Sequence, residues 1–237
     1  MTSIKIISFV ASFLAILLVL PVHEWAHAFI AVKCGDDTPK HHKRLTLNPM
    51  AHFDLMGLAM LVIARFGWAK PVPINPNNFR HLRRDYFFVS IAGVVSNYLL
   101  AFIFYPLWIL SFLLFATTFA QSTFGQMVVS LLSGTLEAVF AISLNLVVFN
   151  LIPVYPLDGF RVLEAIFKKP NKVMDFLREK GYIILLVLIL INFLTDYISV
   201  LAYIDVFGFL MSTLTGIIGQ PIALFWGWIM GLFNYLL

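Results

Sequence analysis

Residues 4–32 read IKIISFVASFLAILLVLPVHEWAHAFIAV, an apolar run that contains His23, Glu24 and His27. A helix needs about 20 predominantly apolar residues to cross the hydrocarbon core of a bilayer. The run therefore predicts a membrane-spanning helix. No small-x-small cleavage site follows its first part, so we expect the helix to be retained and not removed as a signal peptide. Pro21 is expected to kink this helix or to start a new turn.

The composition of the whole chain also indicates a membrane protein. Of 237 residues, 61% are hydrophobic and 12% are charged, whereas soluble domains have about 45–50% apolar and about 25% charged residues. A soluble fold of this size could not bury so much apolar surface in one core. The net charge of +4 is not gathered in a basic stripe interleaved with aromatic residues, so we expect no binding to nucleic acid. The single cysteine, Cys34, excludes an internal disulfide and a Cys-rich metal site.

Further apolar runs follow the first one, at residues 86–116, 127–150, 182–194 and 207–237. A shorter run, 53–69, carries Arg65 and suits a re-entrant segment as well as a span. The sequence thus predicts an all-α polytopic membrane protein with about five transmembrane helices and a re-entrant or hairpin-like segment after the first helix. We expect a single domain over 1–237, with a core at about 4–180 and C-terminal helices at about 181–237.

The distribution of lysine and arginine predicts the orientation of the chain in the bilayer. Loops 33–52, 70–85 and 161–180 are rich in Lys and Arg, whereas loops 117–126 and 195–206 have none. If 53–69 does not cross the membrane, all three basic loops lie on one face, which the positive-inside rule assigns to the cytoplasm. We therefore expect a multi-pass protein of the cell membrane with its functional site toward the cytoplasm.

The sequence His23-Glu24-Trp-Ala-His27 has the spacing of a zinc site on a helix. Residues i and i+4 lie on one helical face, so both imidazoles can reach one Zn²⁺ at about 2.0–2.1 Å. Glu24 could take a proton from water on the metal. A pattern with three fixed positions also arises by chance. However, ionisable groups inside a membrane helix are costly and usually mark function.

A catalytic zinc site needs a third protein ligand and an open position for water. Asp158 is the stronger candidate, because Pro153 and Pro156 end the preceding helix and turn the following Leu-Asp-Gly back toward the protein interior. Alternatively, Asp158 is an N-cap of the next helix. Cys34 lies two turns beyond His27 and is better explained as an inert interfacial residue.

Two motifs in this order resemble the site-2 protease family of intramembrane zinc metalloproteases, in its small type that lacks a PDZ domain. They are His23-Glu-Trp-Ala-His27 and Asn150-Leu-Ile-Pro153-Val-Tyr-Pro156-Leu-Asp158-Gly159, and residues 45–54 and 67–73 extend the match. The resemblance implies that His23, His27 and Asp158 hold one zinc ion and that Glu24 is the catalytic base. It places Asn150 in the substrate or active-site region. It further implies cleavage of the transmembrane segment of another membrane protein, and it leaves the oligomeric state open.

The third core segment departs from the family pattern. A Gly-Pro-x-x-Asn-like element appears here as Ala92-Gly93-Val94-Val95-Ser96-Asn97, with Val in place of Pro. Gly93 could serve the site or only allow close helix packing, and Asn97 could hydrogen-bond across helices. His52 could line the cavity entrance or organise the 45–54 loop. Residues 70–73 could form an extended edge that pairs with an unwound substrate.

Two other classes of protein remain open from the residues alone. A membrane metal transporter could use His23, His27 and Asp158, although it has no need of Glu24. A catalytically silent scaffold of protease descent would not need all four residues intact. A different metalloprotease class would want a downstream Glu as third ligand. Glu137 and Glu164 are present but carry no accompanying motif.

Overall fold

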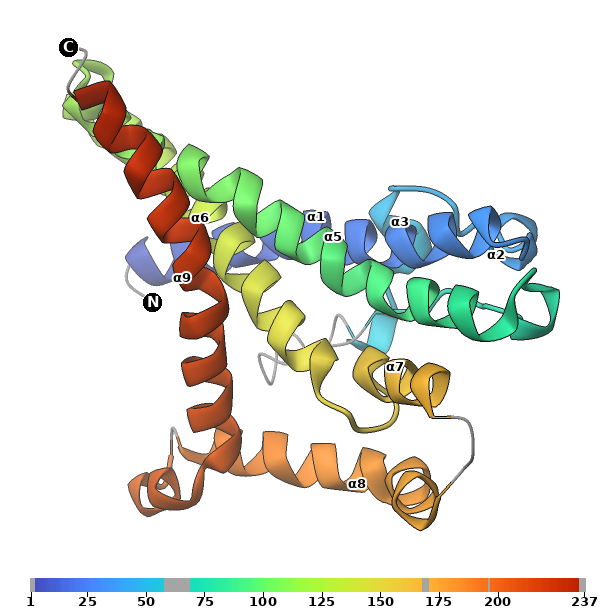
Figure 1. Cartoon of the computed structure of the whole chain (residues 1–237). Helices are drawn as coiled ribbons and strands as arrows, with labels where there is room; N and C mark the ends of the chain where they lie inside the picture. The colour runs from blue at the N-terminus through green and yellow to red at the C-terminus, as the bar shows by residue number, and fades with distance from the viewer. Residues whose placement is uncertain (1–2, 58–68, 168–170, 196, 235–237) are drawn as a thin grey trace.

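The structure is a computed structural model that describes residues 3–57, 69–167, 171–195 and 197–234 (Figure 1). Its long helices are α1 (Ser3–Lys33), α5 (Leu82–Ser111), α6 (Thr123–Leu151), α8 (Lys172–Thr195) and α9 (Val206–Asn234). Its short helices are α2 (Thr38–His41), α3 (Pro49–His52), η1 (Pro76–Asn78), η2 (Phe112–Ala116), η3 (Phe119–Gln121), α7 (Asp158–Ile166) and η4 (Ser199–Ile204). The prediction of an all-α polytopic membrane fold is confirmed.

Four helices within the described ranges are long and apolar enough to cross a membrane. They are Ile4–Lys33, Leu82–Ala116, Thr123–Leu151 and Val206–Leu232. The fifth expected span, 182–194, lies in α8, but Arg178, Glu179 and Lys180 directly precede its apolar part. Residues 181–195 are fewer than the roughly 20 that a span requires. The expected count of about five is therefore not confirmed.

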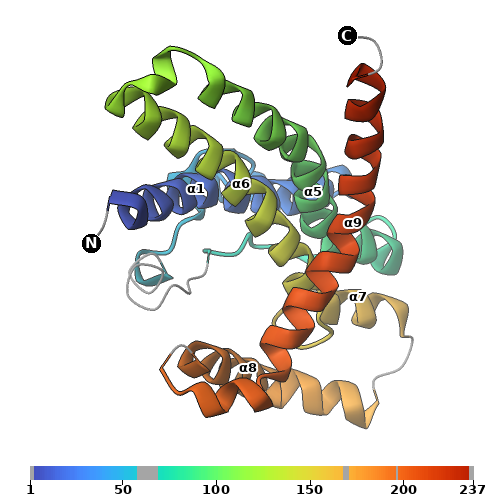
Figure 2. The ribbon, with the colours of Figure 1, turned by 90° about the vertical axis from the view of Figure 1, so that its left-hand side faces the viewer.

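The bundle that positions the site consists of α1, α5 and α6, which lie together in both views (Figures 1 and 2). Small side chains let α1 and α6 approach closely: a Cβ on Gly134 would lie 3.4 Å from that of Ala11, and Ala15 packs with Val139. In contrast, α9 crosses this bundle. Ile222 of α9 packs on Ala101 and Leu144. The Trp226 indole N–H donates a hydrogen bond to the Phe102 carbonyl at 2.9 Å. Helix α8 lies apart from the bundle (Figure 2).

The two ends of the short apolar run 53–69 lie side by side. Phe53 and Ala69 form an antiparallel bridge, and the Lys70 N–H donates to the His52 carbonyl at 2.7 Å. The chain therefore leaves and returns at one place, as a re-entrant or hairpin-like segment must. The path between them, residues 58–68 with Arg65, lies outside the described residues.

Candidate metal centre

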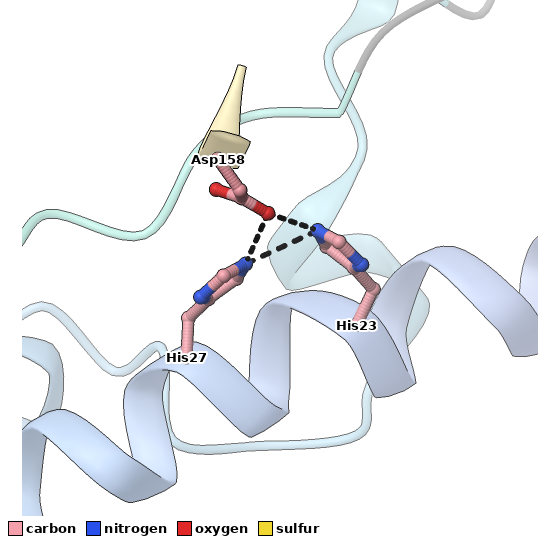
Figure 3. Close-up of side chains that lie close together, drawn as sticks. All are labelled: His23, His27 and Asp158. Carbon is pink, nitrogen blue, oxygen red and sulfur yellow. Dashed lines mark hydrogen bonds and ion pairs between the residues drawn. The ribbon is translucent and has the colours of Figure 1, made fainter. Parts of the chain in front are cut away.

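His23 and His27 project from the same face of α1, which stays helical through Pro21. Their Nε2 atoms are 3.1 Å apart and the rings meet edge to face (Figure 3). The two side chains are almost completely buried, although each is polar. Burial of polar groups is unfavourable unless a partner satisfies them, so the pair requires a third group.

Asp158, the first residue of α7, supplies that third group. Helix α6 ends at Leu151, the chain passes Pro153 and Pro156 without helix, and α7 begins at Asp158. The Asp158 Oδ2 atom lies 3.1 Å from Nε2 of His27 and 3.3 Å from Nε2 of His23 (Figure 3). The N-cap position of α7 is occupied by Leu157, without a side-chain cap. Asp158 therefore points at the histidines and does not cap its helix.

The spacing of the three atoms fits a zinc ion. Ligand atoms about 2.0–2.1 Å from a tetrahedral ion lie roughly 3.3 Å from one another, and the three distances here are 3.1, 3.1 and 3.3 Å. All three can act as acceptors with lone pairs, and acceptors at this distance repel one another unless a proton or a cation lies between them. The residues present thus fit a metal ion, with two imidazoles and one carboxylate as the protein ligands.

Helix α5 provides hydrogen-bond partners for the other nitrogen of each ring. The Val89 carbonyl accepts from Nδ1 of His27 at 2.7 Å, which leaves the Nε2 lone pair of His27 for a metal. The Asn97 amide lies 3.1 Å from Nδ1 of His23 and is fully buried. Its Oδ1 atom has no partner among the described residues. Turning the amide by 180° lets Oδ1 accept from Nδ1, the arrangement that a metal-bound His23 requires.

Gly93 brings α5 against both imidazoles. A Cβ at this position would lie 2.4 Å from Nε2 of His27 and 2.6 Å from Nε2 of His23. Carbon contacts are optimal at about 3.5–4.0 Å, so no other residue fits here without movement of the rings or of α5. Gly93 is therefore part of the wall of the centre, beyond ordinary helix packing.

Glu24 lies beside the histidines and is held by residues 71–73, which have no regular secondary structure. Its Oε2 atom accepts from the Val72 N–H at 3.0 Å. Pro71 and Pro73 have no N–H, so Val72 carries the one backbone donor of 71–73. This hydrogen bond fixes one oxygen of the Glu24 carboxylate beside the two imidazoles.

Residues 70–75 cross the site because both ends of the segment are anchored. At one end, the buried Arg44 donates to the carbonyls of Ala51 and Lys70. At the other, the carboxylate of Asp36 accepts from the Asn75 N–H at 2.7 Å. Burial alone would raise the pKa of Asp36, but hydrogen bonds from its neighbours hold that pKa below its usual value. The anchor is therefore charged at neutral pH.

The centre opens into a cavity of about 120 Å³. Its lining includes His23, Glu24, His27, Asn150, Asp158 and Arg161, together with Pro71, Val72 and Ile74. Sequence reasoning missed Arg161, whose Nη1 lies 3.9 Å from Oδ1 of Asp158. Its position three residues after Asp158, on the same face of α7, was the available signal.

The other expected site residues take different places. Asn150 lines the cavity, and its amide donates to the Leu146 carbonyl at 3.1 Å. His52 is fully buried in the 45–54 loop, where Nε2 is 2.7 Å from the Thr46 carbonyl, and it is not among the described residues that line the cavity of the metal centre. This hydrogen bond favours the loop-organising interpretation of His52.

Comparison with known proteins places these residues in a family context. The family model "Peptidase family M50" matches residues 76–192. The chain is 41% identical over 172 residues to YwhC of Bacillus subtilis, a candidate zinc metalloprotease by name. This alignment covers 70% of the present chain and 74% of YwhC. The chain is also 30% identical over 216 residues to Rip2 of Mycobacterium tuberculosis, which is named in the same way. That alignment covers 87% of the present chain and 77% of Rip2. No solved structure matches the chain.

Proposed function

The chain belongs to peptidase family M50, the site-2 proteases, and is a membrane zinc metalloprotease; from this premise we propose that it cuts other membrane proteins with a zinc ion held by His23, His27 and Asp158. The scissile peptide bond lies in or near a transmembrane segment of the substrate. One observation supports the assignment most strongly: atoms from α1 and α7, far apart in the sequence, meet with the spacing of zinc ligands.

The proposed chemistry gives each cavity residue a task. A bound zinc ion acidifies its water to a pKa of about 7 and polarises a carbonyl group. Glu24, fixed through Oε2 by the Val72 N–H, takes a proton from the attacking water with its other oxygen. It then gives that proton to the leaving amine. The Arg161 guanidinium adds a positive charge to the wall of the cavity where negative charge develops on the substrate.

We infer that the substrate binds as an extended strand along residues 70–73. A helical peptide bond has its carbonyl engaged in a hydrogen bond, so the substrate must unwind before attack. The segment has no regular secondary structure, holds Glu24 through the Val72 N–H, and offers the carbonyls of 71–73 to a partner strand. Photocrosslinkers placed at 70–74 should attach to a bound substrate, whereas attachment only elsewhere would remove this inference.

The function is tested by zinc content and by cleavage of a model transmembrane substrate in detergent. Wild-type protein should hold one zinc ion per chain, lose cleavage when a chelator removes the ion, and regain cleavage when zinc is restored. Asp158→Ala should hold less zinc and should not cut. If Asp158→Ala binds zinc as well as the wild type, Asp158 is not a ligand and the proposed site is wrong.

We propose that the centre faces the cytoplasm, because the loops that border the helices of the site, 33–52, 70–85 and 161–180, are rich in Lys and Arg. In a Cys34→Ser background, His42→Cys should react with a membrane-impermeant maleimide only in inverted vesicles. Thr118→Cys should react only in intact cells. Both positions are exposed. The reverse pattern would place the site on the outer side.

Asn97→Ala tests the hydrogen bond that orients His23. We expect the zinc affinity to fall by about 10–100-fold, as is usual when an outer partner of a metal-bound histidine is removed. Cleavage at saturating zinc should change much less. Competition with a chromophoric chelator measures the affinity, and Asn145→Ala, on the exposed side of α6, is the matched control. Equal zinc affinity in the two variants would contradict the role of Asn97.

A further inference from the structure

A second concave surface lies on the outer side of α1 and α5, separate from the metal centre. It is a groove of about 490 Å³ whose lining is almost entirely apolar. The floor includes the small residues Ala26, Ala92 and Ser96. Its walls include exposed apolar side chains such as Phe88 and Leu99. Both helices are candidate membrane spans, so the groove opens toward lipid.

The length of the groove fits one acyl chain. From Phe88 to Leu99 along α5, eleven residues rise about 17 Å, close to half of the roughly 30 Å hydrocarbon thickness. A hydrocarbon chain that spans one leaflet matches this length, and the small side chains on the floor leave room for it between the two helices.

The end of the groove at Lys33 and Cys34 carries positive charge. Lys33 lines it, with Nζ 5.5 Å from the centroid of the Phe29 ring. Arg80 lies beside Cys34, because its backbone N–H donates to the Cys34 carbonyl at 3.0 Å. Arg84 acts electrostatically on the same thiol, together with Arg80. We define the basic rim as Lys33, Arg80 and Arg84. Two carboxylates lie near this rim: that of Asp85, which pairs with Arg84 at 3.0 Å, and that of Asp36, two residues after Cys34. Three cations against two carboxylates leave the rim with a net positive charge.

We propose that this groove is a binding site for an anionic phospholipid, with one acyl chain between α1 and α5 and the headgroup at the basic rim. The groove is apolar, is about one leaflet long, and ends in cations at the polar end of a membrane helix. It is therefore complementary to such a lipid in shape and in charge. The proposal does not depend on the protease assignment.

Bound lipid in this groove would stabilise the packing of α1 on α5 around the metal centre. Ala26 and Ala92 on the groove floor directly precede His27 and Gly93 in the sequence. The lipid would therefore fill the outer side of the same α1–α5 contact whose inner side holds the imidazoles. Loss of lipid is expected to lower the thermal stability of the purified protein.

The test is native mass spectrometry of the purified full chain, titrated with phosphatidylglycerol or phosphatidylcholine of identical acyl chains. We expect the wild type to retain one phosphatidylglycerol in clear preference to phosphatidylcholine. Lys33→Gln should reduce that preference about fivefold, since one cation near a membrane surface contributes on the order of 1 kcal/mol to the attraction of anionic lipid. Lys180→Gln, which removes an exposed cation of α8 outside the groove, should leave it unchanged.

A second variant tests the contribution of the apolar groove separately from that of the basic rim. Val95→Trp enlarges a side chain of the groove wall that is half exposed, and should abolish tight retention of both lipids while the protein stays monodisperse and bound to zinc. Equal retention of the two lipids by the wild type, equal effects of Lys33→Gln and Lys180→Gln, or full retention by Val95→Trp would each overturn the proposal.

Discussion

Replacement of Glu24 by Gln is expected to lower the cleavage rate by about 10³-fold while leaving one zinc ion bound. General acid–base catalysis by a positioned side chain contributes about 10²–10⁴-fold, and Gln cannot take a proton from water. The change is close to isosteric, and the amide oxygen of Gln can still accept from the Val72 N–H, which now lies 3.0 Å from Oε2. The loss should therefore appear in the rate and not in the fold.

The zinc content separates this result from a damaged site. The three proposed ligand atoms belong to His23, His27 and Asp158, so Glu24→Gln should bind zinc as the wild type does. Glu137→Gln is the matched control, because Glu137 is an exposed carboxylate of α6 outside the cavity. It should cut normally. Cleavage by Glu24→Gln within tenfold of the wild type would assign the base to another group.

Local patterns predicted the chemical groups because spacing along a helix fixes which side chains share a face. The i, i+4 separation of His23 and His27 required only that α1 be helical, and the structure places the two Nε2 atoms 3.1 Å apart. Asp158 was harder to place, since its contact spans more than a hundred residues. The two prolines after α6 indicated a turn toward the protein interior, which made Asp158 a candidate ligand beside the N-cap alternative, and the family resemblance then favoured the ligand role.

The parts that sequence reasoning missed depend on packing between distant segments. The Val72 N–H is a backbone group, so no side-chain pattern could mark it as the partner of Glu24. The expected fifth span was an apolar stretch that follows a run of charges, and hydropathy alone does not say how far α8 reaches. The sequence did not decide the role of Gly93, because a glycine in a membrane helix allows close packing against any neighbouring helix.

Gly93→Ala is expected to remove zinc from the protein, with a loss of affinity greater than 100-fold and loss of cleavage. The added Cβ would lie 2.4 Å from Nε2 of His27, one of the three proposed ligand atoms. The ring cannot retreat, because its Nδ1 is held at 2.7 Å by the Val89 carbonyl. Helix α5 itself must then move, and it carries both Val89 and Asn97. The substitution thus disturbs the ligands and their hydrogen-bond partners together. The loss of zinc affinity should therefore exceed the 10–100-fold loss that follows removal of one partner.

The fold should survive this change, which makes the experiment decisive. Alanine is favoured over glycine by about 1 kcal/mol within a helix, so helicity and elution volume should match the wild type while bound zinc falls. Gly216→Ala on α9, where nothing lies within 4 Å of the new Cβ, controls for the helix propensity and should keep zinc and activity. If Gly93→Ala retains stoichiometric zinc through dialysis, the approach of α5 does not shape the metal centre, and the α1–α5 contact is only packing.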